Sequence, residues 1–90
     1  MSRPNTRLDD GIETLRYIAR GWSAGEAARE IGISEAAAKT RLRRLYGLLG
    51  ARNAAHAVAI AGMQRLLSAE DLRAAVADRR VGWRAPEEEA

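Results

Sequence analysis

The sequence predicts an all-α fold: a helix-turn-helix bundle of four helices plus a short C-terminal helix. Three observations support this fold class. No stretch of the 90 residues alternates between apolar and polar side chains for long enough to indicate a β-strand. Apolar residues instead recur every three or four positions, as on one face of a helix. Most segments with this spacing begin at a residue that caps helices, and several end at glycine.

Composition allows one small domain and excludes several functional classes. The length fits a single domain, which usually has about 50 to 250 residues. The chain has no cysteine, so neither a disulfide nor a thiolate metal site is expected. It has one histidine, no phosphate-binding glycine loop and no carboxylate pair at catalytic spacing, so we expect no enzyme, cofactor or metal. No apolar run approaches the ~20 residues of a membrane helix, and there is no signal-peptide core, which favours a cytoplasmic protein.

The first two helices are predicted from their ends. The first is expected to start at residues 10–13, whose acidic ends resemble a capping signature, and to stop at Gly21. Ser23 and Glu26 form a capping box, in which the serine oxygen accepts from the Glu26 amide and the carboxylate reaches back. The second helix then runs to Ile31. It is short and rich in alanine, so it can approach a neighbouring helix closely.

The third helix, residues 35–49, has the clearest amphipathic pattern. Ser34 is its N-cap, and Gly50 supplies the left-handed residue after its end. A continuous apolar stripe at spacings of four, three and four is expected to be buried: Ala38, Leu42, Leu45 and Leu49. The opposite face is polar.

The rest of the chain contributes two more helices and two terminal segments. Asn53 caps a fourth helix, which is expected over residues 54–66. A capping box from Ser68 to Asp71 starts a fifth helix, which is expected to continue to about Arg79. The predicted divisions are a flexible arm (1–7), a helix-turn-helix domain (8–67), a C-terminal extension helix (68–83) and an acidic disordered tail (84–90).

The positive charge is concentrated in the middle of the chain. The formal net charge of the whole sequence is +3 at pH 7. Residues 36–69 contain no acidic side chain and carry these basic ones: Lys39, Arg41, Arg43, Arg44, Arg52 and Arg65. Such a block is expected of a protein that binds a polyanion, although a solvated helix face produces the same pattern.

The second and third predicted helices have the outline of a helix-turn-helix: a short helix, a brief capped break and a longer basic helix. In this motif the second helix lies in the major groove of DNA and the first braces it. The face opposite the leucine stripe presents Lys39, Thr40 and Arg43, which can contact base edges. Arg41 and Arg44 flank that face and are placed to meet phosphates. The sequence therefore predicts sequence-specific binding of double-stranded DNA and a role in transcription regulation.

A series of short motifs extends this interpretation. The motifs are Gly21-Trp-Ser, Glu26-Ala-Ala, Ile31-Gly-Ile-Ser34, Ala38-Lys-Thr-Arg-Leu42, Leu48-Leu-Gly50, Asn53 and Ala57-Val-Ala-Ile-Ala61. In this order they resemble the LuxR/GerE-type helix-turn-helix family of bacterial regulators, over about residues 8–67. The part after Gly50 is the most specific. Seven residues before Leu8 leave no space for a sensor or receiver domain, so the chain resembles a stand-alone member.

The resemblance implies a dimeric module whose third helix reads DNA and whose fourth helix meets a partner. It implies base reading by Lys39, Thr40 and Arg43. The positions that it implies for contacts to the DNA backbone are Ser34, Ala37, Arg41 and Arg44. The fourth helix also presents a small-residue face suited to a homodimer contact: Ala54, Ala57, Val58 and Ala61.

Two alternatives stay open. The promoter-reading region four of a sigma factor shares an Arg-Leu-Arg-Arg helix, but the motif at 57–61 and the lack of a second sigma domain argue against it. A small helical adaptor or inhibitor that binds RNA polymerase, a sigma factor or another regulator would account for the alanine-rich faces and the acidic tail. Such a protein would contact the transcription machinery through its C-terminal extension. It would lack the steep salt dependence of DNA binding.

Overall fold

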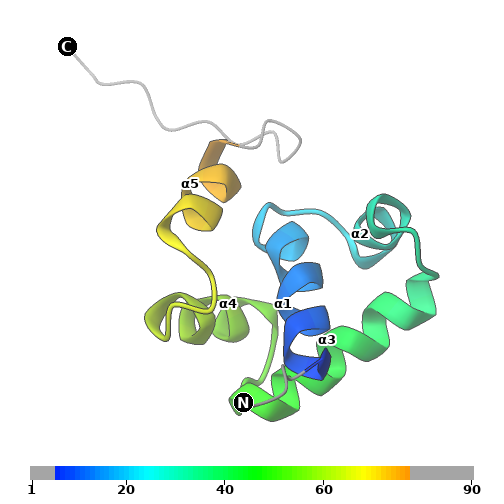
Figure 1. Cartoon of the computed structure of the whole chain (residues 1–90), viewed down its shortest axis with the longest axis horizontal. Coiled ribbons are helices and arrows are strands. Elements are labelled where there is room, and N and C mark those ends of the chain that lie inside the picture. Colours follow the sequence, from blue (N-terminus) through cyan, green and yellow to red (C-terminus); the bar gives the residue numbers. More distant parts are fainter. Residues whose placement is uncertain (1–5, 78–90) are drawn as a thin grey trace.

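The computed structural model describes residues 6–77, and within that range it contains five helices and no strand. The helices are α1 (Thr6–Ala19), α2 (Ala24–Ile31), α3 (Glu35–Leu49), α4 (Ala54–Met63) and α5 (Ala69–Ala77) (Figure 1). The predicted all-α fold class is confirmed for this part of the chain. None of these helices is both long enough and apolar enough to cross a membrane. The predicted acidic tail and the end of the extension helix lie outside the described residues.

Local signals in the sequence set the ends of α2, α3 and α4. Ser23 Oγ accepts a hydrogen bond from the Glu26 amide at 3.1 Å, and the Glu26 carboxylate accepts one from the Ser23 amide at 2.9 Å. Ser34 and Asn53 cap α3 and α4 with their side-chain oxygens. Gly50 follows α3 with a φ of 70°, where a side chain is strained. The predicted caps and the bounds of α3 are therefore confirmed.

Two helix ends differ from the prediction. α1 begins at Thr6, one turn before Asp10, so Thr6 and Arg7 belong to the helix and not to a flexible arm. The acidic residues at 10–13 predicted too late a start for this helix, because acidic residues are favourable throughout the first turn of a helix and not only at its cap. α4 ends at Met63, short of the predicted residue 66. The chain leaves the helix there because Arg65 adopts a positive φ of 61°.

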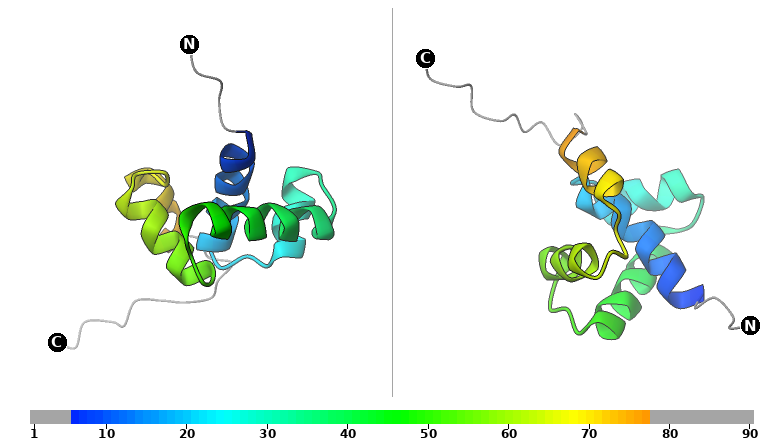
Figure 2. Two further views of the ribbon diagram at one scale, coloured as in Figure 1. Left: turned by 90° about the horizontal axis from the view of Figure 1, so that it is seen from below. Right: turned by 60° about the vertical axis from the view of Figure 1, so that its left-hand side comes forward.

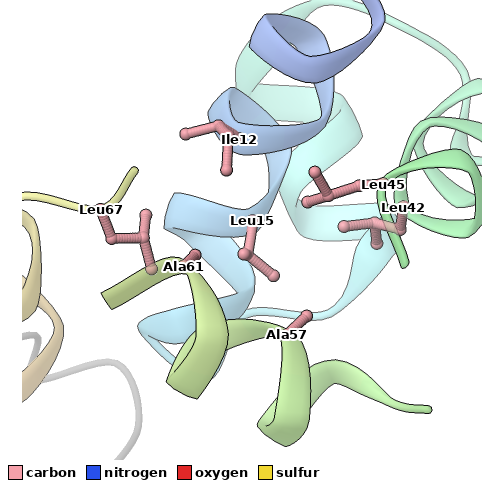
Figure 3. Close-up of a cluster of buried hydrophobic side chains, with 7 residues drawn as sticks. All are labelled: Ile12, Leu15, Leu42, Leu45, Ala57, Ala61 and Leu67. Carbon is pink, nitrogen blue, oxygen red and sulfur yellow. The ribbon is translucent and has the colours of Figure 1, made fainter. Parts of the chain in front are cut away.

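The core lies where α1, α3 and α4 meet. Leu15 and Leu45 have no exposed surface, and Leu67, from the loop after α4, is 1% exposed. Figure 3 shows the buried cluster converging from these elements: Ile12, Leu15, Leu42, Leu45, Ala57, Ala61 and Leu67. The predicted α3 stripe is confirmed, with Leu49 half-buried at its end. Burial of this stripe turns the polar face of α3 outward.

α1 and α3 cross at very short range next to Gly11. Gly11 is buried, and a Cβ atom on it would lie 2.7 Å from the Cβ of Leu45. Two carbon atoms cannot approach so closely without a shift of the backbone, so the crossing requires glycine at this position. The contact holds α3 firmly against α1.

The C-terminal extension packs on the same domain through α5. Arg16 of α1 donates from Nε to Asp71 Oδ2 at 3.2 Å, and Leu72 packs against the core. Asp71 also accepts a hydrogen bond from the Ser68 amide at 2.9 Å, while its own amide donates to Ser68 Oγ at 3.0 Å. The predicted capping box is thus confirmed. Over residues 69–77 the extension is part of the bundle.

Candidate nucleic-acid interface

α3 lies along one side of the molecule with its polar face uncovered. In the left-hand view of Figure 2, α3 passes in front of α1, and no other described helix lies in front of α3. Its buried side carries Ala38, Leu42 and Leu45. Because a helix repeats every 3.6 residues, the opposite side carries Thr40 and Arg43. No other described helix therefore covers the outward side of α3.

α2 and the turn that follows it hold α3 in place. The amides of Gly32 and Ile33 both donate to the Ala28 carbonyl, at 2.8 and 2.9 Å, and Gly32 adopts a φ of 90°. This arrangement satisfies the end of α2 and reverses the chain within a few residues. Ala27 and Ala38 have no exposed surface, so small side chains allow the two helices to pack closely. The pair has the arrangement of a helix-turn-helix.

Arg43 and Arg44 are the cations of α3 that stand free. Both side chains are exposed, and neither forms an ion pair or hydrogen bond with any other residue between 6 and 77. Unpaired guanidinium groups next to each other on a convex surface attract an anion, because nothing in the described protein neutralises them. Thr40 lies half-buried on the same face. The structure thus brings the predicted Thr40 and Arg43 together, with Arg44 beside them.

Lys39, the third predicted base-reading residue, is exposed but already paired. Its Nζ lies 3.1 Å from Glu35 Oε2, one turn earlier in α3, and both side chains are 57% exposed. An ion pair of this kind is worth little, because water screens both charges. Lys39 can therefore leave Glu35 for a stronger anion at small cost.

Arg41, which the sequence predicts as a phosphate contact, already has an acidic partner. Arg41 Nη1 donates to Glu13 Oε1 at 3.2 Å, and the arginine side chain is only 23% exposed. The ion pair joins α3 to α1 on the flank of the polar face. Arg41 therefore links α3 to α1, and its contact with a DNA phosphate stays a prediction.

The two remaining predicted contacts, Ser34 and Ala37, share one hydrogen bond. Ser34 Oγ accepts from the Ala37 amide at 3.0 Å, which caps α3. That amide is consequently engaged and Ala37 itself is half-buried, so it offers only its methyl group to a ligand. The exposed Ser34 keeps its hydroxyl proton, which it can donate to a phosphate oxygen.

The neutral and charged donors of this face suit an oxyanion. Tyr46, near the end of α3, packs against the core, and this burial raises the pKa of its hydroxyl, so Tyr46 is not one of the donors of the outward face. Among residues 6–77, no group of three or more His, Cys, Asp or Glu could hold a metal ion. The face of α3 therefore offers guanidinium, ammonium and hydroxyl donors, which are the groups that bind phosphates and base edges.

Half of the predicted dimer face on α4 is buried within the protomer. Ala57 and Ala61 have no exposed surface, because they pack against α1 and α3 in the core. They cannot contact a partner, and the prediction was wrong for both. Ala54 and Val58 are half-buried at the edge of the same packing. The exposed apolar side of α4 consists instead of Ala55, Ala59 and Met63.

Sequence reasoning missed the acidic partners of this surface. Glu35 stands four residues before Lys39, a spacing that predicts an ion pair on any helix and was available in the sequence. Glu13 is separated from Arg41 by 28 positions and carries no such local signal. Its role became visible only when α1 and α3 were placed side by side.

Comparison of the chain with protein-family models, with curated proteins and with solved structures finds no match.

Proposed function

We propose that the chain is a sequence-specific, double-stranded DNA-binding transcription regulator that places α3 in the major groove. The observation that carries this proposal is the pair Arg43 and Arg44, exposed and unpartnered among residues 6–77 on the open face of the second helix of a helix-turn-helix. An α-helix fits the major groove, and arginine is the residue best suited to guanine edges and phosphates.

Residue roles follow from exposure and pairing. Arg43, near the middle of the outward face, reads a base, while Thr40 offers a hydroxyl and a methyl group to its neighbour. Arg44 contacts a phosphate, and Lys39 joins once it leaves Glu35. The resemblance to the LuxR/GerE-type family supports the same assignment. The protein would act on the nucleoid, in the cytoplasm.

A second copy of the chain completes the proposed site. One helix-turn-helix contacts half of an operator, and two copies one helical turn apart contact both halves. α4 contains no Asp, Glu, Lys or Arg, yet Ala55, Ala59 and Met63 are exposed, Met63 to 87%. Exposed apolar side chains that group on one side of a helix are often covered by a partner surface. This outward side of α4 is therefore the surface through which we expect a homodimer to form.

A second candidate function rests on α5. One side of α5 presents a mainly apolar surface: Ala69, Leu72, Val76 and Ala77, with Arg73 beside them. Val76 is 73% exposed. A small adaptor that docks on RNA polymerase, a sigma factor or another regulator would use such a surface.

Salt dependence separates the two functions. Binding of the full chain to a duplex of random sequence is measured by fluorescence anisotropy between 50 and 200 mM salt, conditions over which ~6–10 phosphate contacts change affinity by about 10³–10⁵. A DNA-binding dimer should lose affinity steeply, with a log–log slope of about −0.9 for each phosphate contacted. Absence of duplex binding at the lowest salt would contradict the DNA-binding proposal and favour the adaptor.

A further inference from the structure

One glycine on the outward face of α3 is not required by the packing or the backbone of residues 6–77. Gly47 is exposed and lies inside the helix, two residues before its end. A Cβ atom added to it would meet no atom of the described protein within 4 Å. Its φ is not positive, so the backbone does not require glycine either. Alanine would fit there and would favour the helix.

Several other glycines have a structural reason. A Cβ atom on Gly11 would lie 2.7 Å from the Cβ of Leu45. Gly32 and Gly50 adopt positive φ angles. Glycine weakens a helix interior, because it loses more backbone freedom on folding than alanine does. At Gly47 nothing within the described protein offsets that loss.

The neighbours of Gly47 indicate what offsets this loss of helix stability. Arg43 and Arg44 lie four and three residues earlier, which places them on the same side of the helix, one turn away. One turn corresponds to about 5.4 Å along the axis. With Arg43 over a base edge, the next turn of a straight helix reaches the edge of a major groove that is about 12 Å wide. At that edge the helix meets the sugar-phosphate backbone.

We propose that Gly47 is a positioning residue for DNA: the missing side chain lets the backbone of α3 approach the sugar-phosphate chain closely. This sets the depth at which Arg43 and Arg44 reach their targets. The inference rests on the proposed DNA-binding function. It assigns a role to the size of a side chain and not to a charge or a hydrogen bond.

The test compares stability with DNA affinity in the same variants. The probe is the duplex that the unchanged chain enriches from a randomised pool. Gly47→Ala should raise the Tm by about 2–6 °C, because alanine favours the helix. It should nevertheless weaken binding to the probe by about tenfold, the size of losing one good base contact. Gly47→Leu should weaken binding further while the circular dichroism spectrum stays helical.

Gly62→Ala is the matched control. Gly62 also lies inside a helix without a positive φ, and its Cβ would be 3.6 Å from Leu72 Cδ1 of the same chain, an ordinary contact. This variant should bind the probe as tightly as the unchanged chain. Equal affinity of Gly47→Ala and the unchanged chain overturns this inference alone. If the unchanged chain binds no duplex at all, the proposed function falls and the inference falls with it.

Discussion

Arg41 Nη1 lies 3.2 Å from Glu13 Oε1, so the helix with the free cations is joined to α1 by an ion pair on its flank. Close to this bridge, the tight crossing of Gly11 and Leu45 fixes the distance between the same two helices. A rigid reading helix is an advantage in DNA recognition, because base contacts depend on sub-ångström placement of a few side chains. The two contacts together hold the outward face of α3 in one orientation.

The first prediction concerns this ion pair. A double-mutant cycle with Glu13→Ala and Arg41→Ala should give a coupling energy of about 0.5 kcal/mol in urea unfolding, because both groups are partly solvated. Arg41→Ala should leave the salt slope of DNA binding nearly unchanged, whereas Arg44→Ala should reduce its magnitude by about one. If both variants flatten the slope equally, Arg41 contacts phosphate as well and the brace is not its main role.

The second prediction concerns the pH dependence of the C-terminal extension. The hydrogen bond from the Ser68 amide lowers the pKa of Asp71, and Arg16 lowers it further, while partial burial opposes both. A lowered pKa means that the carboxylate stabilises the fold above the ordinary pKa of Asp, and that this contribution is lost as pH falls through the lowered value. Asp71→Asn removes this charge but keeps an oxygen that can accept from the Ser68 amide, so it should cost about 0.3–1 kcal/mol at pH 7, the usual worth of a carboxylate near a helix N-terminus.

Urea unfolding at pH 7 and again near pH 2, under otherwise equal conditions, checks this prediction. The difference between Asp71→Asn and the unchanged chain should shrink at the acidic pH, because the folded protein loses the contribution of this charge as pH falls toward the lowered pKa of Asp71. A difference that stays the same at both pH values would mean that the charge of Asp71 contributes nothing and that only its shape matters.

The third prediction concerns assembly. Ala59→Arg places a charge on the exposed side of α4, where the protomer has room for it, and should abolish the homodimer in sedimentation experiments. The melting curve of the isolated protomer should change little. Ala77→Arg, at the exposed end of α5, is the matched control and should leave the dimer intact. The opposite pattern would move the interface to α5.

Much of the fold was predictable because its signals are local. The caps at Ser23, Ser34 and Asn53 each depend on a side chain and an amide a few residues away, and the stripe on α3 depends on spacing alone. The end of α4 was not predictable in the same way. Arg65 adopts a left-handed conformation that is normally found at glycine, so the residue type at this position does not predict the turn.

The candidate site was predictable only in part. The helical spacing of the apolar residues gives α3 a single apolar side, and Arg43 and Arg44 lie away from that side. α4 has a single polar side chain, His56, so the spacing of its residues could not decide whether Ala57 or Ala59 faces the core. The pairing of Arg41 depends on the packing of α1 on α3 and on no neighbouring residue. Local pattern identifies faces, whereas tertiary packing decides which charges on a face are free.

The most direct test of base reading by α3 is a selection from randomised duplexes with the unchanged chain and with Arg43→Ala. The unchanged chain should enrich a roughly palindromic site with a guanine in each half, because an arginine fork matches the O6 and N7 acceptors of guanine. Arg43→Ala should lose the preference at that base pair and weaken binding to the original site by about 1–3 kcal/mol, with the other positions unchanged. If Arg43→Ala enriches the same site with the same preference at every position, α3 does not read bases through Arg43 and the proposed orientation is wrong.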